Sequence, residues 1–97
     1  MATLHSFKAL PGANLVEQGL SDLRDGTETM EALLVSMAAG RLRATGIDVP
    51  RSDGVAAGHR LYALLEAEDG TGAHSRYNAL VGRLAAFARA AEHARAG

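Results

Sequence analysis

The chain of 97 residues carries a formal net charge of −1 and contains no cysteine. The lack of cysteine excludes disulfides, thiolate zinc sites and cysteine nucleophiles, and the near-neutral charge gives no bulk attraction to nucleic acid or anionic lipid. Hydrophobic residues make up 47% of the chain but aromatic residues only 4%, so the core consists mainly of Leu, Ala, Val and Met. This composition favours helices over strands.

Export and membrane signals are missing from the sequence. No apolar run approaches the roughly 18 residues that a membrane span requires. Residues 1–8 lack the basic start and the long apolar centre of a signal peptide. We therefore expect a soluble, cytoplasmic protein that does not bind membranes.

Residues 1–13 are predicted to form an N-terminal arm, because loosely spaced apolar residues lead there to the turn signal Pro11-Gly12. Residues 14–97 contain no repeat and no linker, so we expect a single helical-bundle domain. Its first helix begins at Asn14, which has capping-box spacing to Glu17. The helix ends at Asp25-Gly26, and its inward positions are Val16, Gly19, Leu20 and Leu23.

The second helix is predicted to begin at a cap formed by Thr27 or Thr29. It ends at Gly46, where Ile47 can touch Leu42 in a Schellman ending. The third helix is capped by Ser52 or Asp53 and ends at Asp69-Gly70. The inward positions of these two helices are Met30, Leu33, Leu34, Met37, Ala57, Gly58, Leu61, Leu64 and Leu65.

The longest helical pattern runs from Thr71, its predicted cap, to Ala94. All connections are short, so sequential helices pack antiparallel. The sequence therefore predicts an all-α, up-and-down bundle of about four helices with a long C-terminal helix. The core side of this long helix is expected to carry Tyr77, Leu80, Val81, Leu84, Phe87, Ala88 and Ala91.

The opposite side of the long helix carries a row of small residues at spacings of three and four, which let another backbone approach closely. A solvent-facing helix would carry charged side chains there. Either the helix is central to its own bundle, or it meets a second chain. We expect a homodimer, or contact with a protein partner, through an interface of Ser75, Ala79, Gly82 and Ala86.

Two charged residues interrupt the apolar stripes: Arg41 in the second helix and Glu68 in the third. A direct pair between them is doubtful, because antiparallel neighbours put them at different levels. One alternative is that Arg41 reaches the rim of the bundle. Another is a ligand or anion site in a cleft between helices, with candidate residues Arg41, Glu68, His74, Arg76, Tyr77 and Asn78.

Catalytic and metal sites are not predicted. The neighbours His74 and Ser75 point about 100° apart on a helix, and no GxSxG motif is present, so we name no catalytic residue. The four histidines are scattered and Glu68 is the only inward acid, which argues against a metal site. We expect no metal and no cofactor.

Three function classes remain after these exclusions. The first is a non-enzymatic interaction module that self-associates through the long helix. The second is a binder of small molecules or anions. The third is a nucleic-acid binder with Arg76 and Arg83 on one helix flank, which is disfavoured because glutamates dilute any basic patch.

Overall fold

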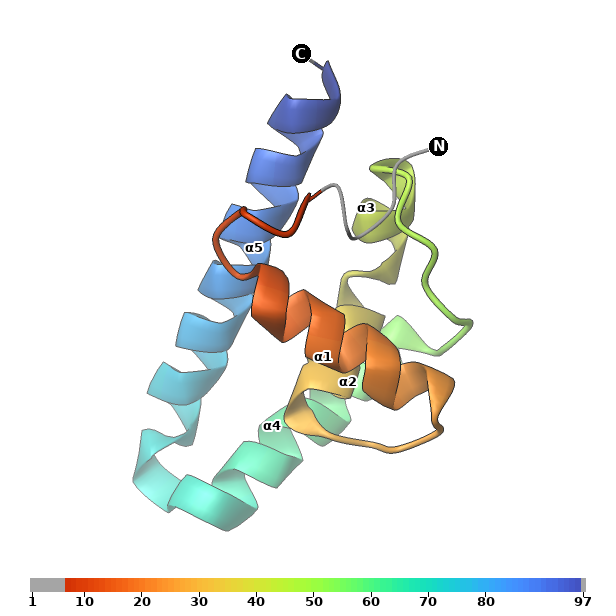
Figure 1. Ribbon diagram of the computed structural model, residues 1–97. Coiled ribbons are helices and arrows are strands. Elements are labelled where there is room, and N and C mark those ends of the chain that lie inside the picture. Colours follow the sequence, from red (N-terminus) through yellow and green to blue (C-terminus); the bar gives the residue numbers. More distant parts are fainter. Residues whose placement is uncertain (1–6, 97) are drawn as a thin grey trace.

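The computed structural model describes residues 7–96, in which every regular element is a helix and no strand occurs. The elements are α1 (Ala13–Arg24), α2 (Met30–Met37), α3 (Ala39–Ala44), α4 (Gly54–Asp69), the 3-10 turn η2 (Gly70–Gly72) and α5 (Ala73–Ala96). This confirms the predicted all-α fold class and the long C-terminal helix. The four predicted helices correspond to α1, to α2 with α3, to α4 and to α5 (Figure 1).

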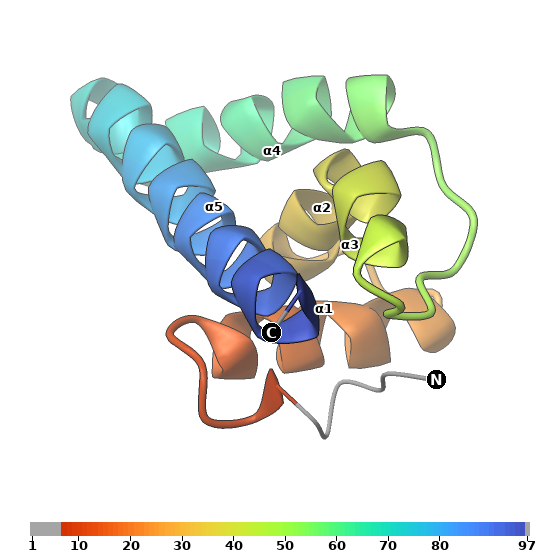
Figure 2. The same cartoon turned by 90° about the horizontal axis from the view of Figure 1, so that it is seen from above.

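Each main helix packs on the next along the chain: α1 on α2, α2 on α4, and α4 on α5. Seen from above, α2 lies between α1 and α4 (Figure 2). The chain reverses direction at η2, and α5 runs back across the bundle, where it contacts α2 and α1 (Figure 1). Helix α5 thereby covers the core that α1, α2 and α4 form by packing on one another.

Helix α1 begins at Ala13, one residue earlier than predicted. The predicted capping box of Asn14 and Glu17 does not form. Its N-cap is Gly12 at φ 78°, and no side chain caps the helix. The carbonyl of Gly12 accepts hydrogen bonds from the N–H groups of Leu15 and Val16. A Cβ atom at Gly12 would lie 3.1 Å from the Arg83 carbonyl oxygen. The close approach to α5 and the positive φ therefore require glycine at this position. This contact, and not the capping signal of Asn14, sets the start of α1.

The end of α1 is the predicted stop. Gly26 has φ 73°, its N–H donates to the Leu23 carbonyl, and the N–H of Thr27 donates to the Asp22 carbonyl, which is a Schellman motif. Of the two candidate caps for the second helix, Thr29 is the one used: its hydroxyl accepts from the Ala32 N–H at 3.1 Å and donates to Asp22 at 2.6 Å. Asp22 thus joins the two helices.

The predicted second helix is broken at Ala38, which has φ −100° and ψ 13°. Neither proline nor glycine stands at the break, so the local sequence carried no signal for it. The predicted ending is confirmed: Gly46 has φ 93°, and the N–H of Ile47 donates to the Leu42 carbonyl at 3.3 Å. Leu42 and Ile47 are both buried in the core.

The predicted cap of α4 is confirmed, but the predicted cap of α5 is not. Asp53 caps α4 by accepting from the N–H groups of Val55 and Ala56, and Gly70 at φ 54° ends it, as predicted. The predicted cap Thr71 is wrong, because it lies inside η2 and α5 begins only at Ala73. The chain reverses in a 3-10 turn between two glycines.

Phe87 of α5 is the largest side chain that the described residues bury completely. Phe7 packs against it edge-on, with ring centroids 6.2 Å apart and planes at 87°. The predicted inner stripe of α5 is confirmed: four of its residues are buried and three pack partly buried against the core. In chain order these are Tyr77, Leu80, Val81, Leu84, Phe87, Ala88 and Ala91.

Gly19 allows α1 and α2 to pack closely, because a Cβ atom there would overlap the Glu31 carbonyl oxygen and a methyl group of Val35. We predict that Gly19→Ala destabilises the fold by about 1–3 kcal/mol through overpacking. This loss outweighs the gain of up to ~1 kcal/mol in helix propensity. Urea denaturation measures the change.

The matched control is Gly40→Ala in α3, where a Cβ atom meets no described atom within 4 Å. That substitution should leave stability unchanged or raise it by up to ~1 kcal/mol. Equal effects of the two substitutions would contradict the close packing of α1 on α2.

Candidate functional site

The outer face of α5 carries the four small residues predicted as an interface. Ser75, Ala79 and Gly82 are exposed and Ala86 is partly buried. A Cβ atom at Gly82 would have no described atom within 4 Å. We call these four positions the small-residue face. Within residues 7–96, no other helix covers the centre of this face.

Arg41 pairs with an acid of α5 that the sequence did not single out. Its Nε donates to Glu92 Oε2 at 2.7 Å and its Nη2 donates to Oε1 at 3.0 Å, which is the two-pronged geometry of arginine with carboxylate. The pair is accessible, because the side chains are 43% and 42% exposed. The hydrogen bonds raise the pKa of Arg41 and lower the pKa of Glu92.

The second predicted arginine belongs to a separate pair. Arg76 Nη1 lies 3.4 Å from Glu68 Oε1, and its Nη2 donates to Met30 Sδ at 3.4 Å. Sixteen residues separate Arg76 from Glu92 on α5, which is about 24 Å along a helix. The structure therefore does not bring Arg41 and Arg76 together, and Arg41 does not pair with Glu68.

His74, Tyr77 and Asn78 lie near one another at the start of α5. Asn78 Nδ2 and His74 Nε2 are 3.2 Å apart. The ring of Tyr77 packs edge-on against Tyr62 of α4, with centroids 5.3 Å apart. Sequence reasoning missed Tyr62, because nothing in the local pattern of α4 distinguishes it from other partly buried positions. Tyr77 is half-buried and serves the packing of α4 on α5.

A cleft runs along the flank of α5 next to α2. Its cavity volume is about 180 Å³, and apart from Arg41 at the rim its lining is apolar. A second hollow of about 370 Å³ also has Met37 in its lining, together with the aromatic pair Tyr62 and Tyr77. We call the first hollow the α2–α5 cleft; it is lined by Leu34, Met37, Ala38, Arg41, Val81, Leu84, Ala85 and Ala88.

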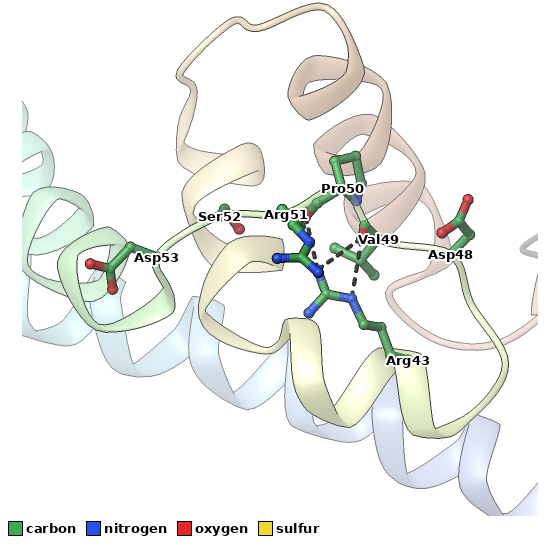
Figure 3. A pocket seen from close by; sticks show the side chains of 7 residues that line it. All are labelled: Arg43, Asp48, Val49, Pro50, Arg51, Ser52 and Asp53. Carbon is green, nitrogen blue, oxygen red and sulfur yellow. Dashed lines mark hydrogen bonds between the residues drawn. The ribbon is translucent and has the colours of Figure 1, made fainter.

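The connector between α3 and α4 forms another hollow, in which Arg43 and Asp53 make hydrogen bonds to the backbone (Figure 3). Arg43 donates to the carbonyl oxygens of Val49 and Pro50 at 2.8 and 3.0 Å. Asp53 caps α4, and the hydroxyl of Ser36 donates to that of Ser52. These bonds hold the connector against α2 and α3.

The described residues form neither a metal site nor a membrane-spanning helix. Among residues 7–96, no three histidine or acidic side chains gather closely enough to hold a metal ion. No described helix is long and apolar enough to cross a membrane. No protein-family model matches the chain, and no curated protein or solved structure matches it significantly. The chain is a small all-α protein, and the two surface features that bear on its function below are the small-residue face and the α2–α5 cleft.

The Arg41–Glu92 pair predicts a pH response. The lowered pKa of Glu92 means that the pair stabilises the fold above the usual carboxyl pKa, and that this contribution is lost as the pH falls through the lowered value. In Arg41→Met, we expect the pKa of Glu92 to rise into its usual range. Carbon-13 NMR titration of the carboxyl group measures both values.

The same substitution should change the melting temperature only slightly at neutral pH, because exposed ion pairs contribute little. The difference between the two proteins should vanish in acid. An identical Glu92 pKa in both proteins would contradict the pairing.

Proposed function

We propose that the protein is a non-enzymatic interaction module of the cytoplasm that self-associates through the small-residue face of α5. The observation that supports this most directly is the exposure of Ser75, Ala79 and Gly82 on the longest helix. Small side chains let two helix backbones approach closely, so that many weak contacts add up. A twofold dimer is the commonest form of such self-association.

Helix lengths support the proposal. The 24 residues of α5 extend about 36 Å, whereas the 12 residues of α1 extend about 18 Å. The core stripe of α5 is used within the chain, but its opposite side presents no long side chain at positions 75, 79, 82 and 86. Gly82 costs α5 up to ~1 kcal/mol of helix propensity, a cost that close helix contact would offset.

A second candidate function, binding of a small molecule or anion, is favoured by one observation. The α2–α5 cleft places Arg41 at the rim of an apolar hollow. The other residues proposed for such a site lie elsewhere: Arg76 pairs with Glu68, and Tyr77 packs on Tyr62. A binder would therefore use the cleft around Arg41 rather than the whole predicted set.

Replacement of Ala79 by arginine tests self-association. Ala79 is exposed, so Ala79→Arg should leave the monomer folded, while its long charged side chain prevents close contact between two helices. We expect light scattering to report a dimer for the unmodified protein and a monomer for Ala79→Arg at the same concentration.

The matched control is Ala67→Arg, at an exposed alanine of α4 outside the small-residue face. It should dimerise like the unmodified protein. If Ala79→Arg remains as dimeric as Ala67→Arg, the small-residue face is not the interface.

A further inference from the structure

We propose that the α2–α5 cleft binds an aliphatic carboxylate, with the carboxylate on Arg41 and the hydrocarbon chain in the cleft. The inference does not depend on self-association, because the cleft lies on the flank of α5 whereas the small-residue face lies on its outer side. Val81 and Ala85 line the cleft, and neither belongs to the small-residue face.

The lining of the cleft defines the hydrocarbon part of the ligand. Every lining residue except Arg41 is apolar, so a bound chain buries methylene groups without leaving polar groups unpaired. The volume of about 180 Å³ is below the roughly 300–1,000 Å³ of pockets for drug-sized ligands. A single narrow chain fits this space better than a fused-ring molecule.

The rim of the cleft defines the head group. Two N–H groups of Arg41 already bind the carboxylate of Glu92 in bidentate geometry. Glu92 follows Val81, Ala85 and Ala88 along the same flank of α5, since steps of three and four residues share a helix face. Its carboxylate therefore marks the position that a ligand carboxylate would take.

Exchange of Glu92 for a ligand is feasible because both side chains of the pair are about two-fifths exposed. Exposed ion pairs contribute little net stability, so Glu92 can turn to solvent at small cost. A ligand carboxylate gains the charge-assisted hydrogen bonds that Glu92 gives up, and its chain adds apolar contact. In this proposal the carboxylate of Glu92 competes with the ligand carboxylate for Arg41.

Titration of the 97-residue protein with octanoate, followed by NMR of the methyl groups, tests the proposal. We expect saturable one-to-one binding with the largest shifts at Leu34, Met37 and Val81. Octanol, which lacks the charge, and acetate, which lacks the chain, should each bind at least about tenfold more weakly. Shifts centred elsewhere, or no saturable binding of octanoate, would overturn the proposal.

Three variants separate this site from non-specific adsorption. Arg41→Met should weaken octanoate binding about tenfold or more, whereas Glu92→Gln should strengthen it because the competitor loses its charge. Ala85→Leu should weaken binding by filling the cleft, and Ala67→Leu on the exposed side of α4 is the matched control. Equal octanoate affinity in the unmodified protein, Arg41→Met and Glu92→Gln would show that Arg41 takes no part.

Discussion

The burial of Phe87 is the contact on which the arrangement of the helices depends. Its side chain is completely buried, with Phe7 against its ring and the backbone of Gly12 close to its Cβ atom. Because this contact fixes the inner side of α5, the rotation of the helix about its axis is set as well. The small-residue face must then point outward, and the flank that carries Val81 and Ala85 must border α2.

Much of the fold could be predicted because its signals are local. The side chain of Asp53 accepts from two backbone N–H groups of its own helix, and Gly46 ends a helix through its own positive φ. Three features differ from the prediction. Asn14 does not cap because Gly12 must approach α5, the second helix breaks at Ala38 without a local breaker, and the corner at Gly70–Gly72 replaces a cap at Thr71. Contacts distant in sequence decided the first of these, and such contacts leave no periodic pattern.

The surface sites were less predictable than the core. Arg41 was recognisable as a charged residue in an apolar stripe, but its partner Glu92 lies 51 residues away in an alanine-rich segment of α5. Whether Arg41 meets Glu92 depends on how α3 and α5 are rotated relative to each other. The sequence pattern of a single helix does not contain that information. The small-residue face was predictable because it depends only on the period of one helix, and its exposure follows from the packing on the other side.

Sedimentation velocity of the unmodified protein, from low micromolar to tens of micromolar concentration, tests most directly whether the outward face of α5 is an interface. Self-association through this face predicts that the weight-average mass rises with concentration, from that of one chain toward that of two. A single species with the mass of one chain over the whole range would contradict the account.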